Sequence, residues 1–298
     1  MGLPEEEYFA PGHRACAGCG AAIALRIITK AAGKNSILVE PTGCMEVVST
    51  PYPETAWRLP WIHGAFENAS SIASGVRAAL DVLGKKDVDV VAFGGDGSSY
   101  DIGLGCLSGA FERGDDFTYI CYDNEAYMNT GIQASGATPY GASTTTSPSG
   151  SMSLGKHSQK KNLLEILLAH GSPYLATASI GYPQDAYKRI RKAIETKGPT
   201  FVNLYAPCPT GWRTPGEKTV KLAKLAVETG FIPLYEVENG KYKVSMPLEG
   251  AVKPIEEYLS AQGRFAHLFK PRKNEEAINF IQNNINKSLE RLYKLSKM

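Results

Sequence analysis

The sequence predicts an α/β fold in which a mostly parallel sheet is covered by helices on both faces, with a helical extension at the carboxyl end. Short apolar segments of five or six residues alternate with segments whose apolar residues recur at helical spacing, which is typical of parallel sheets. The chain of 298 residues is 43% apolar and 21% charged, as expected for a globular protein with a sizeable core.

The expected elements follow one another along the chain. A helix is expected over residues 20–33, ending at Gly33, and a strand over residues 36–40, ending before Pro41. The remaining elements of this part are helices at 66–83, 102–112, 162–169 and 184–196, and strands at 88–93, 117–122 and 201–205. Ligands of such sheets bind at the carboxyl ends of the strands, so a site is expected there.

Two domains are expected, over residues 1–213 and 214–298. Residues 207–218 hold three prolines and two glycines and predict a boundary. Beyond it we expect a helix at 218–229, a hairpin turn at Asn239-Gly240, and helices at 253–262 and 274–297. The last helix carries an apolar stripe, which either packs on its own core or forms a subunit interface.

Charge and hydropathy exclude several classes of protein. The net charge is +2, from 32 basic and 30 acidic residues, so neither nucleic acid nor an anionic membrane is an expected partner. No apolar run approaches the length of about 18 residues that a membrane helix needs. The acidic start does not resemble a secretory signal, and a cytoplasmic location is expected.

A candidate metal and phosphate site follows the strand at 88–93. That strand runs into Gly95-Asp96-Gly97-Ser98, which has the position of a phosphate-binding loop. A carboxylate beside a diphosphate would be repelled by it unless a cation lay between them. Asp96 therefore predicts a bridging divalent metal, for which Mg²⁺ with oxygen ligands is the natural candidate.

The next strand supplies further metal ligands. Asn124 lies 28 residues after Asp96, a gap that one helix and one strand fill, so both residues are expected at the same edge of the sheet. The side-chain oxygen of Asn124 and the carbonyl of Ala126 could complete the protein part of the metal shell. The alternative is that these are two polar turns that merely close their strands.

The six cysteines divide into two groups. Cys106 and Cys121 lie in apolar patterns and are expected to be buried small hydrophobic residues. The other four lie in loops and suggest a four-thiolate site: Cys16, Cys19, Cys44 and Cys208. From the spacing alone, structural zinc and an iron–sulfur cluster are equally good interpretations.

Several motifs together resemble a known family. Gly95-Asp96-Gly97 with Asn124 resembles the thiamine-diphosphate signature, and residues 124–139 closely resemble the β subunits of pyruvate:ferredoxin oxidoreductases (pyruvate synthases). The segments Cys-Ala-Gly-Cys-Gly at 16–20 and Ala-Pro-Cys-Pro-Thr-Gly-Trp at 206–212 match the same family. The similarity spans about residues 8–213 and continues more weakly to the end.

The resemblance implies a thiamine-diphosphate-binding fold and roles for individual residues. It implies that the [4Fe–4S] cluster nearest the cofactor is held by Cys16, Cys19, Cys44 and Cys208. A cluster suits this place better than zinc, because zinc cannot accept electrons. It places Gly20, His63, Ser98 and Thr130, with Gly95, Asp96, Gly97, Asn124 and Ala126, at the thiamine diphosphate and Mg²⁺. It matches Asn129 to a position that contacts the 2-oxo acid. A packing role for His63 and a turn-stabilising role for Asn129 are the alternatives.

The implied activity is the reversible oxidation of pyruvate with coenzyme A to acetyl-CoA and CO₂, with ferredoxin as electron acceptor. The alternatives are another 2-oxo acid (2-oxoisovalerate, 2-oxoglutarate or oxalate), a cluster-free thiamine decarboxylase subunit with structural zinc, or a non-enzymatic electron-transfer module. A basic run consists of Lys156, Lys160 and Lys161. It is either the solvated start of a helix or a cationic surface that attracts the phosphates of coenzyme A or an acidic ferredoxin domain.

The length indicates a subunit rather than a complete enzyme. Thiamine enzymes need a carboxylate from a pyrimidine-binding domain, which takes about 150–200 residues. Only about 85 residues follow residue 213, and they lack a βαβ pattern. We therefore expect a chain that is inactive alone and works with an α subunit carrying the pyrimidine domain, a γ subunit and a ferredoxin-like δ subunit, in an anaerobic cytoplasm.

Overall fold

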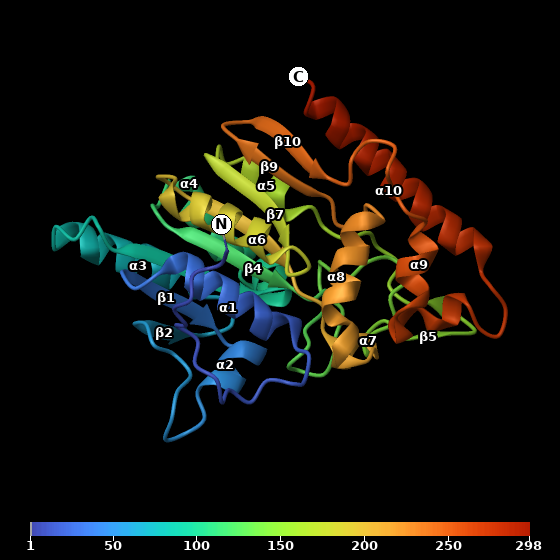
Figure 1. Ribbon diagram of the computed structural model, residues 1–298, viewed down its shortest axis with the longest axis horizontal. Helices are drawn as coiled ribbons and strands as arrows, with labels where there is room; N and C mark the ends of the chain where they lie inside the picture. The colour runs from blue at the N-terminus through green and yellow to red at the C-terminus, as the bar shows by residue number, and fades with distance from the viewer. Residues whose placement is uncertain (1) are drawn as a thin grey trace.

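The computed structural model describes residues 2–298 and shows one main sheet between two layers of helices (Figure 1). Its strands are β1 (Ser36–Pro41), β2 (Trp61–Gly64), β3 (Asp89–Gly95), β4 (Thr118–Asp123), β7 (Tyr174–Ser179), β8 (Thr200–Tyr205), β9 (Leu234–Glu238) and β10 (Lys241–Met246). Their order in this eight-stranded sheet is β10-β9-β7-β8-β4-β3-β1-β2. The six neighbouring strands β7, β8, β4, β3, β1 and β2 pair in parallel. Strand β9 pairs antiparallel with β7 on one side and with β10 on the other. The short strands β5 (Ser149–Gly150) and β6 (Ser153–Leu154) form a separate hairpin.

Helices cover both faces of this sheet. The helices are α1 (Gly20–Ala32), α2 (Cys44–Ser49), α3 (Ala69–Val82), α4 (Leu104–Glu112), α5 (Leu163–Leu168), α6 (Pro183–Glu195), α7 (Pro209–Trp212), α8 (Thr219–Glu228), α9 (Ile255–Ser260) and α10 (Glu275–Leu295). A π-helical turn, η1 (Gly97–Ile102), and two 3₁₀ turns, η2 (Gly216–Lys218) and η3 (Gly263–Leu268), complete the set.

The two-residue period of the strands explains why both faces are apolar. Leu38 of β1 and Ile120 of β4 face a core that they share with α1 and α6. Their neighbours Val39 and Tyr119 face the opposite core, which is shared with α3, α4 and α5. The inner parallel strands β1, β3, β4, β7 and β8 therefore bury nearly every residue, as parallel strands between two helical layers must.

The structure confirms the predicted parallel sheet with helices on both faces, and it corrects several boundaries. The helix expected over 66–83 begins at Ala69. The helix expected over 102–112 is α4, preceded by the π-helical turn η1 directly after Asp96. Strands β2 and β7 were not anticipated, because β2 has four residues at the sheet edge and β7 reads as Tyr-Leu-Ala-Thr-Ala-Ser, whose alanines do not favour a strand.

The carboxyl-terminal part contributes both to the sheet and to a third core. The predicted Asn239-Gly240 turn is confirmed, with φ of 48° and 79°, and its hairpin extends the main sheet beyond β7. The apolar stripe of α10 packs on its own core, against residues of α9 and η3, and does not form an exposed face. The domain division at residue 213 stays a prediction, although the hairpin that follows it completes the sheet that precedes it.

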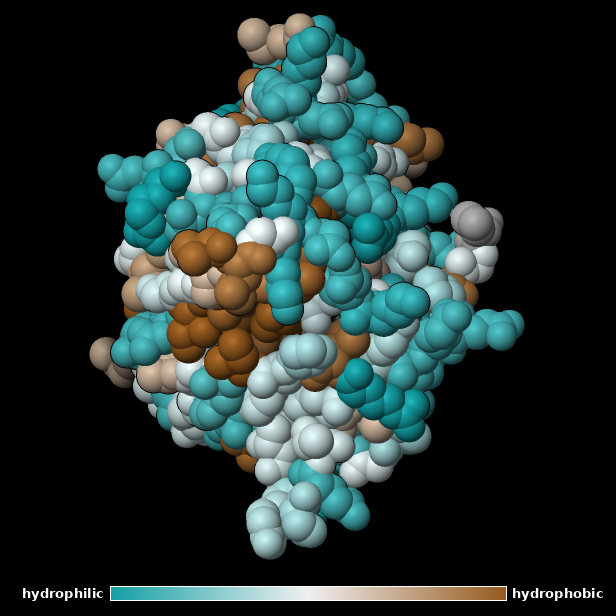
Figure 2. Space-filling model, turned by 90° about the vertical axis from the view of Figure 1, so that its left-hand side faces the viewer, coloured by the Kyte–Doolittle hydropathy of each residue, from teal (hydrophilic) through white to brown (hydrophobic). Residues whose placement is uncertain are grey.

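Two surface properties bear on partners. Within residues 2–298, none of the helices is both long and apolar enough to cross a membrane. Figure 2 shows apolar side chains gathered on the side of the molecule that carries α3, where Val82 at the end of that helix is 88% exposed and Leu83 is 67% exposed.

Candidate active site

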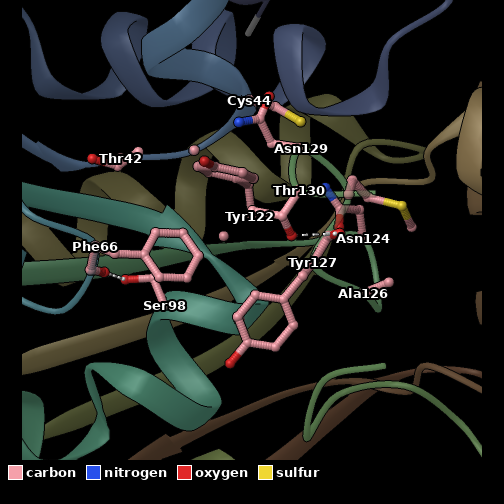
Figure 3. Close-up of a pocket in the computed structure, with 14 residues that line it drawn as sticks. Thr42, Cys44, Phe66, Ser98, Tyr122, Asn124, Ala126, Tyr127, Asn129 and Thr130 are labelled. Carbon is pink, nitrogen blue, oxygen red and sulfur yellow. Dashed lines mark hydrogen bonds between the residues drawn. The ribbon is translucent and has the colours of Figure 1, made fainter. Parts of the chain in front are cut away.

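A pocket lies at the carboxyl ends of β1, β3 and β4, where the fold predicts a site (Figure 3). Four segments meet there: the turn after β1, the loop after β2, the turn η1 after β3, and the turn after β4. The pocket is lined by Thr42, Gly43, Cys44, Phe66, Gly95, Gly97, Ser98, Tyr122, Asn124, Ala126, Tyr127, Met128, Asn129 and Thr130. Eight of the residues singled out in the sequence are thus brought together.

Asp96 lies directly beneath the pocket. It is fully buried at the start of η1, accepts a 3.3 Å hydrogen bond from the backbone N–H of Asn124, and accepts another from the Ser135 hydroxyl. Burial, with the nearby Asp123, raises the pKa of Asp96 to about 8. A bound cation would reverse this shift, because a positive charge favours the ionised carboxylate.

Three polar atoms, one each from Asp96, Asn124 and Ala126, come together at this turn. One amide atom of the Asn124 side chain lies 2.9 Å from Oδ1 of Asp96 and 2.9 Å from the carbonyl oxygen of Ala126. If that atom is nitrogen, it donates two hydrogen bonds. If it is oxygen, three acceptors face one another, which requires a cation between them. Neighbouring corners of an octahedron with Mg–O bonds of about 2.1 Å are about 2.8–3.0 Å apart, so the three residues fit a magnesium shell.

Close backbone approach at the turn depends on glycine. A Cβ on Gly97 would lie 2.5 Å from the Tyr127 ring, which leaves no room for any larger residue. A π-helical turn begins at this glycine, and single π-turns are frequent at functional sites. The hydroxyl of Ser98, by contrast, donates to the carbonyl of Phe66 at 2.8 Å, so its side chain supports the turn.

Gly97→Ala should therefore weaken cofactor binding without unfolding the chain. The added methyl must displace the Tyr127 ring from the pocket wall. We expect at least about a tenfold loss of thiamine-diphosphate affinity, similar to other distortions of a ligand's supporting residues. Titration calorimetry of the assembled enzyme with thiamine diphosphate and Mg²⁺ measures this. Gly105→Ala is the matched control, because a Cβ on Gly105 meets nothing within 4 Å.

A buried ionic network holds the turn after β4. Lys160 contacts Asp123 at 2.5 Å and Glu125 at 2.9 Å, and Arg264 contacts Glu125 at 2.6 Å. Both carboxylates are fully buried. Burial alone would raise the pKa of Glu125, but Lys160 and Arg264 hold it below its ordinary value. Asn124, between the two carboxylates, is thereby fixed from both sides.

The carboxyl-terminal part reaches this network through Arg264 of η3. Its guanidinium stacks on the Trp212 ring at 3.8 Å, and the indole N–H of Trp212 donates to the Asn124 carbonyl at 2.9 Å. Glu125 takes a positive φ of 66°, which is unfavourable for a glutamate and is held by these contacts. Residues 139 positions apart thus cooperate to shape the candidate metal turn.

The basic run is neither a solvated helix start nor a free cationic patch. Lys156 donates to the carbonyls of Ser135 and Thr138, Lys160 is in the buried network, and Lys161 pairs with Asp101 at 3.1 Å. Sequence reasoning missed the structural role of Lys160, together with Glu125, Arg264 and Ser135. The acidic pair flanking Asn124 was the one available signal, because buried carboxylates need cationic partners.

The four loop cysteines gather beside the pocket from three segments: the loop before α1, the start of α2 and the residue before α7. The Cys16–Cys19 loop packs against the segment after β8: the N–H of Gly20 donates to the Pro207 carbonyl at 3.2 Å, and a Cβ on Gly18 would lie 2.3 Å from the Gly216 oxygen. Burial raises the pKa of Cys44 to about 12, and the thiols of Cys208, Cys19 and Cys16 add to this shift. The four thiols are therefore close enough to influence one another.

These thiols do not converge on a single point. Among residues 2–298, no three His, Cys, Asp or Glu side chains are grouped tightly enough to hold one metal ion. A four-iron cluster distributes its thiolates over four separate irons, so it spaces them more widely than one tetrahedral zinc does. The donor set, four thiols with all cysteines free and no histidine among them, fits such a cluster.

The remaining predicted residues lie at the margins. His63 does not line the pocket; its ring contacts Thr42 at 2.9 Å, and Thr42 does line it. Gly20 begins α1 under the cysteine loop and away from the pocket. Asn129 and Thr130 are exposed at the pocket mouth. Cys121 is buried as expected, whereas Cys106 is only half-buried, because α4 turns part of that side chain toward solvent.

Comparison with known proteins places the chain in a family. A family model described as thiamine pyrophosphate enzyme, C-terminal TPP binding domain, matches residues 41–204. The pyruvate synthase subunit PorB of Methanothermobacter thermautotrophicus is 59% identical over 274 residues, which cover 92% of this chain and 94% of that protein. The chain belongs to the PorB family of 2-oxoacid:ferredoxin oxidoreductase subunits.

Other relatives of this PorB-family chain differ in the substrate that their names give. The ketoisovalerate oxidoreductase subunit VorB of Pyrococcus abyssi is 48% identical over 302 residues, covering 99% of this chain and 96% of that protein. A solved 2-oxoglutarate:ferredoxin oxidoreductase from Magnetococcus marinus is similar in fold, with a TM-score of 0.59 and 23% identity over 74% of this chain and 81% of that one. The PorB-family chain is therefore one subunit of a multi-subunit enzyme.

Proposed function

We propose that this chain binds thiamine diphosphate with Mg²⁺ and the proximal [4Fe–4S] cluster in an enzyme that oxidises pyruvate with coenzyme A to acetyl-CoA and CO₂. Ferredoxin accepts the electrons, and the reaction is reversible. The observation that carries the proposal is the convergence of Asp96, Asn124 and Ala126, at spacings that fit neighbouring corners of an octahedron, beside a glycine-lined pocket with four cysteines next to it.

The chain's own residues hold and orient the cofactor. Asp96, Asn124 and the Ala126 carbonyl take the metal, and the backbone of η1 at Gly97 faces the diphosphate. When bound, thiamine diphosphate supplies the electron sink for loss of CO₂ from a 2-oxo acid. Asn129 and Thr130, at the pocket mouth, are placed to meet the substrate, and His63 and Gly20 support the pocket from outside.

The partner subunits complete the site. None of the pocket-lining residues is a glutamate or an aspartate, and Asp96, directly behind the lining, is committed to the metal. The carboxylate that a thiamine enzyme needs for the pyrimidine ring must then come from an α subunit seated over this pocket. A γ subunit and a ferredoxin-like δ subunit would complete the enzyme, with the α subunit covering the exposed Asn129.

Cys208→Ser tests the cluster half of the proposal. Serine supplies an alkoxide only at high cost, so the cluster should lose one ligand and its stability. We expect the assembled enzyme to lose the iron and sulfide of one cluster while it keeps thiamine diphosphate. Cys106→Ser, in α4, is the control and should keep both. The cluster assignment would be contradicted if the wild-type protein contained zinc and the iron content of Cys208→Ser equalled that of the wild type.

The substrate is tested by a panel of 2-oxo acids. The enzyme, assembled and purified anaerobically, is assayed with pyruvate, 2-oxoisovalerate, 2-oxoglutarate and oxalate in the presence of coenzyme A and ferredoxin. We expect the highest kcat/KM for pyruvate and no activity from the isolated chain. A higher kcat/KM for 2-oxoisovalerate would transfer the proposal to the VorB-type reaction. We also propose a cytoplasmic location, because the four cysteines must stay reduced to bind a cluster.

A further inference from the structure

Tyr122, near the end of β4, faces the pocket, and none of the roles above uses its hydroxyl. The side chain is buried, at 2% exposure. Its ring packs on the diphosphate turn, since a Cβ on Gly95 would lie 3.3 Å from it. Its hydroxyl reaches the other turn, since a Cβ on Gly43 would lie 2.9 Å from the phenol oxygen. One phenol thus extends from Gly95, the residue before Asp96, to Gly43, the residue before Cys44. Figure 3 shows Tyr122 and Cys44 among the residues that line the pocket.

The Tyr122 hydroxyl lacks a protein partner. Within residues 2–298 none of the hydrogen bonds involves it, whereas the hydroxyl of Tyr100 donates to Asn203 and that of Tyr174 donates to Glu236. The ring is buried, but the hydroxyl is not one of the fully enclosed unpaired polar atoms of the described residues, so it opens to the pocket, where a tyrosine O–H ordinarily finds a partner. A group that binds in the pocket is therefore the expected acceptor.

The position of the Tyr122 hydroxyl indicates which bound group accepts its hydrogen bond. The phenol oxygen is closer to a Cβ at Gly43, at 2.9 Å, than to one at Gly95, at 3.6 Å. Gly43 has an extended φ of 174°, which any residue can adopt, so glycine there provides space for the hydroxyl. The next residue is Cys44, which lines the same pocket as Tyr122. The hydroxyl thus points to the cysteine side of the pocket.

We propose that the Tyr122 O–H donates a hydrogen bond to the sulfur centre held at Cys44 and raises its reduction potential. This inference rests on the proposed cluster. Reduction adds negative charge to the cluster, and a donor aimed at its sulfur stabilises the reduced form more than the oxidised one. Tyr122 is a positioning and tuning residue: it stays a neutral donor and transfers neither a proton nor an electron.

The test is a redox titration of the assembled, anaerobically purified enzyme, followed by electron paramagnetic resonance. Tyr122→Phe removes only the hydroxyl, and we expect one cluster step to shift to lower potential while thiamine-diphosphate affinity stays the same. Gly43→Ala should shift the same step, because its methyl displaces the hydroxyl. The double variant should show no further shift, since both changes remove one interaction. Tyr119→Phe is the matched control, because the Tyr119 hydroxyl pairs with Ser99 and does not line the pocket.

The outcomes separate this inference from the proposed function. An unchanged potential in Tyr122→Phe, with the wild-type cluster present, overturns the role of Tyr122 alone. An unchanged potential with a fall in thiamine-diphosphate affinity also overturns it, and assigns the hydroxyl to the diphosphate instead. A wild-type enzyme that contains no iron–sulfur cluster overturns the proposed function itself.

Discussion

Asp96→Asn should abolish Mg²⁺-dependent binding of thiamine diphosphate by the assembled enzyme. Asparagine keeps the shape of the side chain and its place beneath the pocket, but removes the negative charge that the cation needs. Loss of residues that only support a metal ligand costs about 10–100-fold in affinity, so loss of a charged ligand should cost at least about 100-fold. Equilibrium dialysis with thiamine diphosphate, at several Mg²⁺ concentrations, measures the effect.

Asp101→Asn is the control for this substitution. Asp101 belongs to the same turn η1, but its carboxylate accepts from the Gly136 N–H at 2.7 Å and pairs with Lys161, away from the metal oxygens. We expect it to leave both the affinity and its dependence on Mg²⁺ intact. Equal losses in the two variants would mean that η1 is merely destabilised, and unchanged binding in Asp96→Asn would refute the metal assignment.

Arg264→Met should loosen the turn after β4, although Arg264 does not line the pocket. The substitution leaves Glu125 buried with only Lys160 and Tyr205 as polar side-chain partners. Breaking a buried ion pair by removing one partner costs about 3–5 kcal/mol. We expect a lower thermal midpoint of the assembled enzyme, faster hydrogen–deuterium exchange at residues 123–127, and weaker Mg²⁺ binding.

The double variant Arg264→Met with Glu125→Gln distinguishes charge from packing. Neutralising the stranded carboxylate should recover part of the lost stability, because the uncompensated charge causes most of the cost. No recovery would show that the Arg264 side chain acts by packing on Trp212. The exposed pair Lys294–Glu290 on α10 is the comparison, and Lys294→Met should change stability by less than about 1 kcal/mol.

The sequence was informative where chemistry is encoded locally. Asp96 and Asn124 each follow a continuous apolar strand, and parallel strands must bring those two turns together. The Asn239-Gly240 turn is likewise dictated by two adjacent residues that tolerate positive φ. Such features depend on short stretches and on the geometry of the sheet, so they could be predicted without the structure.

Long-range pairing could not be predicted in the same way. Lys160 read as part of a surface run, because its two carboxylate partners lie 35 and 37 residues earlier and meet it only in the folded chain. Arg264 lies outside the part of the sequence where motifs were strong, and Trp212, although it ends one of those motifs, meets Arg264 only in the folded chain. Tyr122 reads as one more apolar residue of a buried strand, and only the two glycines beside it show that its hydroxyl faces a site.

The most direct test of the account is the cofactor content of the assembled, anaerobically purified enzyme. Thiamine diphosphate, magnesium, iron and sulfide are measured in the wild type, in Asp96→Asn and in Cys208→Ser. The account predicts that Asp96→Asn loses thiamine diphosphate but keeps its iron, and that Cys208→Ser loses the iron of one cluster but keeps thiamine diphosphate. A wild-type protein with zinc in place of iron, or variants that retain both groups, would contradict it.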